Sequence, residues 1–287
     1  MNVAVFGATG VVGRALVPLL AEHELTAVSR TARDEPGARW VVADAASGGG
    51  VAAALEGADV VYYLVHSLGA RDFEEQDRAA AETVAGEAAN AGVQQIVYLG
   101  GLGADGPDAS PHLRSRRETG QRLASAGVPV TTLRAAMIVG KGSAAFETIL
   151  GLVKRLPVMV TPSWVSTPTQ PIALPDVVAY LNGVGGRAET LGEGYDVGGP
   201  DVLAYREMIE VIARLRGRHP IIVEVPVLSP RLSSYWLHLV TPVRASVARP
   251  LVEGLATPTV VRDTRIRDLL PLELTPFEDA ARAALGP

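Results

Sequence analysis

The chain has 287 residues, of which 48% are hydrophobic, so it can bury a large core in one compact α/β domain or in one domain with a smaller appended lobe. Its net charge of −5 argues against a nucleic-acid partner, and the absence of cysteine excludes disulfides, thiolate metal ligands and thiol nucleophiles. The first predicted strand leaves no room for a secretory leader, and no apolar run approaches the ~20 residues of a membrane span, so we expect a cytoplasmic protein.

The glycine-rich turn after the first predicted strand, Asn2–Phe6, is the most informative segment. Gly7, Gly10 and Gly13 are spaced G-x-x-G-x-x-G, and a helix-compatible segment, Val11–Glu22, follows at once. The first glycine permits a tight turn, the second lets a pyrophosphate approach the backbone, and the third allows close packing of helix and strand. Because the positive end of the helix faces the anion, we interpret this segment as a dinucleotide site and not as a simple glycine turn. The predicted cofactor-binding residues here are Gly7, Thr9, Gly10, Val11, Val12 and Gly13.

Strand-like runs alternate with helical patterns through the first half of the chain. This alternation predicts βαβ units and therefore a doubly wound, Rossmann-type parallel sheet of α/β class. The other strands are expected near Leu25–Val28, Arg39–Val42, Val60–Leu64, Gln95–Leu99 and Val130–Leu133.

The clearest predicted helix lies between the fourth and fifth strands. Its apolar face carries Phe73, Ala80, Ala81, Val84 and Ala88 at helical spacing. Its acidic side, which we expect to be solvated and not part of a site, carries Glu74, Glu75, Asp77 and Glu82.

Beyond about residue 140, prolines break the pattern into short elements and then mostly helical segments. We expect a dinucleotide-binding domain at 1–140, with segments near 170–198 (strands at 170–173 and 194–197) returning to its sheet. Residues 141–169 and 199–287 would then form a smaller, mostly helical substrate or lid lobe. An apolar stripe within 232–240 favours a lid helix over an apolar pocket, and the alternative is a helix that docks on a partner or a membrane surface.

The end of the second predicted strand indicates which dinucleotide is bound. An acidic residue there would accept hydrogen bonds from the ribose 2′-hydroxyl of NAD, but this chain has Ser29, Arg30 and Arg33. Arginine offers a fork of donors to a 2′-phosphate, so we expect NADP(H), with NAD(H) as the other possibility. For Arg33, a solvent-exposed loop position is the alternative.

Further cofactor contacts are expected where later strands end. Asp44 either accepts from the adenine amino group or is a plain turn residue. Leu64, Val65 and His66 should run under the dinucleotide, although the histidine is also consistent with a polar residue at the sheet edge. After the sixth strand, Ala136 should lie near the nicotinamide; Arg134 is either near it or a buried structural residue.

Several motifs together resemble a known family. They are GATGVVG, VVAD, YYLVHS, IVYLGGLG, VTTLRAAMIVG and QPIALPDVVAYL. This set resembles the atypical, extended branch of the short-chain dehydrogenase/reductases, and in particular bacterial NAD(P)H-binding proteins described as NAD-dependent epimerase/dehydratase-like. NmrA-like redox sensors and an accessory subunit of respiratory complex I are more distantly similar. The resemblance implies an NAD(P)H-binding oxidoreductase.

The chain departs from that family at the catalytic pair, a Tyr followed four residues later by a Lys. None of the seven tyrosines has a lysine at that spacing, and the family's serine position falls near Gly100-Gly101. In a helix expected to begin at Ser110-Pro111, His112 and Arg116 occupy the Tyr and Lys positions. The helix N-terminus, the arginine and an oxidised nicotinamide would all keep the imidazole neutral. The arginine could hold ribose hydroxyls or stabilise an oxyanion. The alternative is a helix-start histidine and a surface arginine with no catalytic role.

These observations favour an NADP(H)-dependent oxidoreductase whose small-molecule substrate is an apolar carbonyl or quinone-like compound. Such activated acceptors need less acid assistance than a simple ketone. The alternative function is a non-catalytic NAD(P)H-binding redox sensor or partner-docking protein, because fold alone cannot distinguish the two. The five histidines show no paired metal-ligand spacing, so we expect no metal site.

Overall fold

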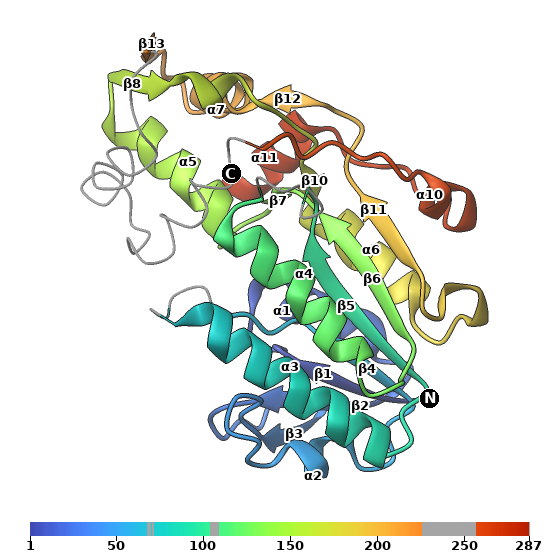
Figure 1. Ribbon diagram of the computed structural model, residues 1–287. Helices are drawn as coiled ribbons and strands as arrows, with labels where there is room; N and C mark the ends of the chain where they lie inside the picture. Colours follow the sequence, from blue (N-terminus) through green and yellow to red (C-terminus); the bar gives the residue numbers. More distant parts are fainter. Residues whose placement is uncertain (68–69, 71, 104–108, 226–256, 287) are drawn as a thin grey trace.

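A seven-stranded parallel sheet forms the centre of the computed structural model, which describes residues 1–67, 70, 72–103, 109–225 and 257–286 (Figure 1). The strand order is β11-β6-β5-β4-β1-β2-β3, so the order of the strands along the chain reverses direction between β1 and β4. This is the predicted doubly wound Rossmann-type topology, in which ligands bind beyond the carboxyl ends of the strands at this topological switch point. The strands are β1 (Asn2–Phe6), β2 (Glu24–Ser29), β3 (Arg39–Val42), β4 (Val60–Tyr63), β5 (Gln95–Gly101), β6 (Val130–Ala135) and β11 (Gly194–Val197).

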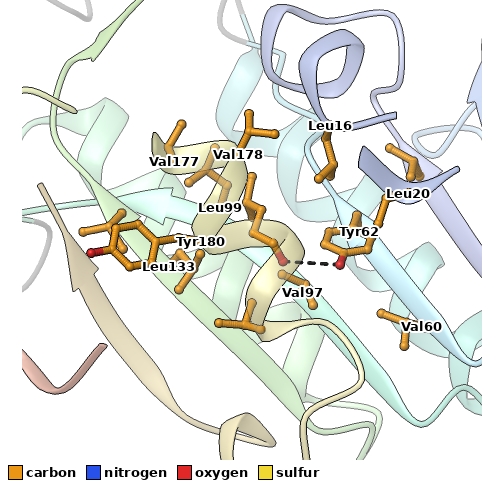
Figure 2. Close-up of a cluster of buried hydrophobic side chains, with 14 of the residues drawn as sticks. Leu16, Leu20, Val60, Tyr62, Val97, Leu99, Leu133, Val177, Val178 and Tyr180 are labelled. Atoms are coloured by element: carbon orange, nitrogen blue, oxygen red, sulfur yellow. Dashed lines mark hydrogen bonds between the residues drawn. The ribbon is translucent and has the colours of Figure 1, made fainter. Parts of the chain in front are cut away.

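Helices cover both faces of the sheet, because alternate residues along each strand point to opposite sides. On one face, Val3 and Val5 of β1 pack in a core with α1 (Val11–Leu16), η1 (Val17–Leu20) and α6 (Leu174–Val184). Figure 2 shows part of this core, where the Tyr62 hydroxyl donates to the carbonyl oxygen of Leu181 at 3.3 Å. On the other face, Ala4 and Phe6 of β1 pack in a core shared with α2 (Val51–Leu55), α3 (Phe73–Asn90) and α4 (Pro111–Ala124).

Helix α3 confirms the predicted apolar face but not the predicted acidic one. Ala80, Ala81, Val84 and Ala88 are buried, as their spacing indicates. Asp77, expected in solvent with Glu74 and its other acidic neighbours, is only 3% exposed. The expectation was wrong for this residue because it lies three and four positions before two buried alanines, at the edge of the apolar face. Polar partners on neighbouring elements satisfy its carboxylate there.

The second lobe lies beyond the carboxyl ends of β5 and β6 (Figure 1). Its elements are β7 (Ile138–Val139), α5 (Ala144–Arg155), β8 (Val158–Pro162), η2 (Ser163–Ser166), β9 (Pro168–Thr169), β10 (Ile172–Ala173), β12 (Leu203–Ala204), α7 (Tyr205–Leu215), β13 (Ile221–Val225) and α11 (Phe277–Leu285). Two short elements lie outside this lobe: η3 (Ala188–Thr190) lies near the start of β6, where the Thr190 carbonyl accepts from Thr131, and α10 (Arg265–Leu269) packs beside β11. The segment near 194–197 returns to the central sheet as β11, but the expectation that the strand at 170–173 also returns was wrong. Strand β10 pairs with β7 in a separate two-stranded sheet, because both strands already lie past the end of the central sheet.

Two further sequence expectations concern the lobe and the membrane. The predicted lid helix with its apolar stripe at 232–240 lies outside the described residues. In the part of the chain that the structure describes, no helix combines the length and the apolar character needed to cross a bilayer.

Aspartates fasten the C-terminal segment to the rest of the fold. Asp176 at the start of α6 is buried, and its carboxylate accepts the backbone N–H of Thr275 at 2.7 Å and the hydroxyl of the same threonine at 3.0 Å. Asp201 accepts the backbone N–H of Phe277, the first residue of α11, at 2.7 Å. The C-terminal helix is therefore held at its beginning by charge-assisted hydrogen bonds.

An Asp176→Ala variant should lose about 2 to 3 kcal/mol of unfolding free energy, because two donors are left without their charged acceptor in a part-buried site. Urea unfolding followed by circular dichroism measures the change. Asp34→Ala is the control, since Asp34 is exposed in a loop and should change stability by less than about 0.5 kcal/mol. Equal stability of the two variants would contradict the anchoring role.

Candidate functional site

The glycine-rich turn connects β1 to α1 in the geometry that an anion site requires. Gly7 has a φ of +86°, and a Cβ there would lie 2.9 Å from the Leu64 carbonyl oxygen. A Cβ on Gly13 would lie 2.7 Å from the Cα of Ala8. Helix α1 begins after Gly10 with no side chain capping its first N–H groups, so these donors remain available. The glycines at positions 7 and 13 therefore let the turn, the strand and the helix pack closely, and the free N–H groups at the start of α1 can face a pyrophosphate.

A cavity of about 450 Å³ opens from this turn and follows the carboxyl ends of β4, β5 and β6. Its wall brings together most of the predicted site residues, namely Gly7, Gly10, Val11, Val12, Gly13, Leu64, His66, His112, Arg116 and Ala136. The predicted residues that do not line it are Thr9, Ser29, Arg30, Arg33, Asp44 and Val65. The cavity therefore lies at the end of the site where a nicotinamide would sit.

Two arginines follow β2, and their surroundings differ. Arg30 is exposed and forms no ion pair within the described residues. Arg33 pairs with Glu35 at 2.7 Å and lies over the Trp40 ring, 5.9 Å from its centroid. Ser29 is buried, and its hydroxyl accepts the backbone N–H of Thr31 at 3.3 Å. Of the two guanidinium groups, that of Arg30 is the one left available to an incoming phosphate.

Three other residues considered in the sequence analysis make contacts within the protein itself. The Asp44 carboxylate accepts the backbone N–H of Ala46 at 3.1 Å, which is the arrangement of a turn aspartate. Val65 packs against the core on the α3 face of the sheet. Arg134 pairs with Asp196 on the adjacent strand at 2.6 Å and does not line the cavity, so of the two alternatives the structural one holds.

The start of α4 carries the first of the predicted catalytic residues. The Ser110 hydroxyl accepts the backbone N–H of Leu113 at 3.3 Å, with proline at the first helical position, as the sequence predicts. Burial, together with the charges of Arg116 and His66, lowers the pKa of His112 to about 3. The sequence analysis expected a neutral imidazole because of the helix N-terminus, the arginine and the nicotinamide, but burial is the largest cause of the lowered pKa. For His66, which faces the open cavity, desolvation and the nearby arginine lower the pKa to about 4, so both imidazoles are neutral at pH 7.

Arg116 is buried under the cavity wall and is not a surface residue. Its side chain is 8% exposed, and one guanidinium nitrogen, Nη2, donates to the Leu99 carbonyl oxygen. The guanidinium lies 5.0 Å from the centroid of the Tyr98 ring, whose hydroxyl donates to the Arg116 carbonyl oxygen at 2.8 Å. A second guanidinium nitrogen, Nη1, is buried and has no hydrogen-bond partner among the described residues. A buried cation with an unused donor beside a cavity is costly unless a ligand completes it.

Asp77 is the residue of this region that the sequence analysis missed. One carboxylate oxygen accepts the backbone N–H of Ser67 at 2.7 Å, and the other accepts the hydroxyl of Ser115 at 3.3 Å. It therefore joins the residue after His66 to the residue before Arg116. Burial raises the pKa of Asp77, while the hydrogen bonds from Ser67 and the charge of Arg116 oppose the rise. Its spacing from the buried alanines of α3 was the available signal.

Glycines and the second lobe complete the cavity wall. A Cβ on Gly101 would lie 3.0 Å from the Leu113 side chain, so glycine at the family's serine position lets α4 approach β5. Tyr205 at the start of α7 and Thr259 of the C-terminal segment line the cavity from the second lobe. No local pattern in the sequence indicated these two residues, because they come from elements remote in the chain.

Comparisons with known proteins agree with this geometry. Residues 7–147 match the family described as NAD(P)H-binding. The chain is 29% identical over 228 residues to a (4-alkanoyl-5-oxo-2,5-dihydrofuran-3-yl)methyl phosphate reductase of Streptomyces griseus, covering 75% of this chain and 74% of that protein. It is 24% identical over 298 residues to the Arabidopsis thaliana mitochondrial NADH dehydrogenase [ubiquinone] 1 alpha subcomplex subunit 9, covering 94% and 74%. The Escherichia coli NADPH-dependent quinone oxidoreductase QOR2, solved with NADPH, superposes with a TM-score of 0.77 at 19% identity over 98% of both chains.

Proposed function

We propose that this protein, whose residues 7–147 match a family described as NAD(P)H-binding, is an atypical short-chain dehydrogenase/reductase that acts as an NADP(H)-dependent reductase of quinones or conjugated carbonyl compounds. The cofactor would supply the hydride. The chain would supply the binding site, the exclusion of water and the stabilisation of the charge that hydride addition leaves on the substrate.

The residues present fit the cofactor at each of its parts. The N–H groups at the start of α1, which no side chain caps, would hold the pyrophosphate, and Gly7 and Gly13 would keep the turn close to the helix because a Cβ has no room at either position. Arg30 and Ser29 would hold the 2′-phosphate. His66, His112 and Ala136, on the cavity wall, would surround the nicotinamide end.

Arg116 is the observation that carries this proposal. Neutral imidazoles with a pKa near 3 or 4 are poor proton donors, and a guanidinium cannot release a proton at neutral pH. A buried guanidinium with an unused N–H donor can, however, stabilise negative charge on an oxygen. Hydride addition to a quinone or to a double bond conjugated with a carbonyl leaves this charge delocalised on a weakly basic phenolate or enolate oxygen, whereas a simple ketone gives a strongly basic alkoxide that needs a proton donor. The site therefore suits these acceptors better than simple ketones.

The relatives' names support the same class of acceptor. The Streptomyces griseus protein is named as the reductase of a dihydrofuran derivative, in which the ring double bond is conjugated with the oxo and alkanoyl groups. The Escherichia coli enzyme with the same fold is named a quinone oxidoreductase. In both kinds of substrate the negative charge left by hydride addition is delocalised onto oxygen.

An Arg116→Met variant should lose about 100-fold or more in kcat/KM for the best acceptor found by screening NADPH with quinones, enones and aldehydes, because an oxyanion donor is removed. Arg117→Met is the matched control. Arg117 is the exposed neighbour of Arg116 on α4, so this variant should retain kcat/KM within about twofold. Equal kcat/KM for the two variants would exclude the proposed role of Arg116. NADPH binding by the wild-type protein without turnover of any acceptor would overturn the reductase and favour the redox sensor.

A further inference from the structure

The cavity has an unusual balance of charge at its nicotinamide end. Among the described residues that line it, Arg116 is the one with a permanent charge. His66 and His112 stand beside it as neutral imidazoles. The N-terminus of α4 adds a further positive partial charge close to His112. Any ligand group in this part of the cavity therefore meets a positive potential, which water screens less than it screens a charge on the open surface because Arg116 is buried.

The two redox forms of the cofactor differ in charge at one place. The oxidised nicotinamide ring carries a positive charge and the reduced ring is neutral, whereas the phosphates are alike in both forms. A fixed charge near the ring therefore changes the ratio of the two dissociation constants, while one near the adenosine end changes both together. A fixed positive charge near the ring disfavours the oxidised form.

We propose that the buried charge of Arg116 makes this site bind NADPH more tightly than NADP⁺, and that the carboxylate of Asp77 limits this preference. The inference rests on the cofactor binding of the proposed function but not on the identity of any substrate. It makes the protein selective for the redox state of the cofactor, whether or not turnover follows.

Asp77 is a buried acidic residue whose pKa is raised by burial and lowered by the charge of Arg116, so the two charges interact. Its carboxylate accepts from Ser115, the residue adjacent to Arg116 on α4, and it is 3% exposed. The charges of Arg116 and Asp77 act in opposite directions on the pKa of the Tyr63 hydroxyl, which is buried and has no hydrogen-bond partner among the described residues. Removing the carboxylate charge should therefore strengthen the positive potential, and removing the guanidinium should weaken it.

The size of the effect follows from Coulomb's law. Two unit charges about 7 Å apart, at an effective dielectric constant of about 20, change a ratio of dissociation constants by roughly 10- to 50-fold. A neutral substitution of Arg116 should lower the ratio of Kd for NADP⁺ to Kd for NADPH by about that factor. Asp77→Asn should raise the same ratio by a smaller factor, about threefold or more, since Arg116 lines the cavity and Asp77 does not.

Isothermal titration calorimetry of wild-type, Arg116→Met, Arg116→Lys, Asp77→Asn and Arg117→Met proteins with NADPH and NADP⁺ at pH 8 tests the proposal. We expect Arg116→Met to lower the ratio, Asp77→Asn to raise it, and Arg116→Lys, which keeps the charge, to stay within about threefold of wild type. Arg117→Met, on the exposed face of α4, should not change it.

The signs of the changes separate an electrostatic effect from loss of structure. If Arg116→Met leaves the ratio unchanged, or if it and Asp77→Asn move the ratio in the same direction, the proposal is wrong. If Arg116→Met does not fold, Asp77→Asn and Arg116→Lys still decide it by the same signs. If the wild-type protein turns over an acceptor but its ratio of Kd for NADP⁺ to Kd for NADPH is near 1, this inference is wrong and the proposed reductase activity stands. A high ratio without turnover would overturn the reductase alone.

Discussion

A Gly13→Ala variant should bind NADPH at least about 100-fold more weakly than the wild-type protein and should unfold at a lower temperature. A Cβ at this position would lie 2.7 Å from the Cα of Ala8 and closer still to the carbonyl oxygen of Gly7. Both atoms belong to the backbone of a tight turn, so no flexible side chain can move aside. Helix α1 would have to shift away from β1, at a cost of about 1 to 3 kcal/mol, and its N–H groups would leave the pyrophosphate position. Calorimetric titration with NADPH and a thermal unfolding curve measure the two effects.

Gly86→Ala provides the opposite control for this prediction. Gly86 lies within α3, and a Cβ there would have no heavy atom within 4 Å. Alanine should therefore stabilise the helix by about 0.5 to 1 kcal/mol and leave NADPH affinity unchanged. If Gly13→Ala binds NADPH within threefold of Gly86→Ala, the turn does not hold the pyrophosphate.

The central sheet was predictable because each of its signals is local. The apolar runs at Arg39–Val42 and Val60–Tyr63 are bounded by turn residues, and the helical face of α3 repeats every three or four positions. The left-handed φ of Gly7 and the tight packing at Gly13 follow from the spacing of the glycines in one short segment. Parallel strands joined by helices then admit few topologies, so the doubly wound order could be inferred.

The second lobe was less predictable because its elements are short and depend on distant partners. Strands β7 and β10 have two residues each, and they pair with one another across more than thirty residues of sequence. A two-residue strand has no periodicity that could indicate which sheet it joins. Tyr205 and Thr259 reach the cavity only through such long-range contacts.

Within the site, residue types were predictable but burial was not. The spacing of His112 and Arg116 follows from the family pattern, yet nothing in the helix sequence shows that Arg116 lies beneath the cavity wall, 8% exposed. Asp77 shows the same limit, because a carboxylate at the edge of an apolar helical face is usually solvated. Here Ser67 and Ser115, from two other elements, supply the hydrogen bonds that allow its burial.

The end of β2 is expected to determine the choice between NADP(H) and NAD(H). Arg30 is exposed and forms no ion pair within the described part of the chain, whereas the guanidinium of Arg33 is engaged by Glu35 and the Trp40 ring. Hydrogen bonds between arginine and a phosphate contribute about 1.5 to 3 kcal/mol. A carboxylate at the same place would repel the phosphate and accept from a ribose 2′-hydroxyl.

An Arg30→Glu variant should therefore bind NADPH about 100-fold more weakly and NADH several-fold more tightly, which reverses the cofactor preference. Fluorescence titration of each reduced cofactor gives the two dissociation constants. Arg33→Glu is the matched variant, and it should change the NADPH constant by less than about fivefold, since Arg33 already pairs with Glu35 at 2.7 Å. A larger loss of NADPH affinity for Arg33→Glu than for Arg30→Glu would show that Arg33, and not Arg30, holds the 2′-phosphate. Equal binding of NADPH and NADH by the wild-type protein would mean that this strand end does not select the cofactor.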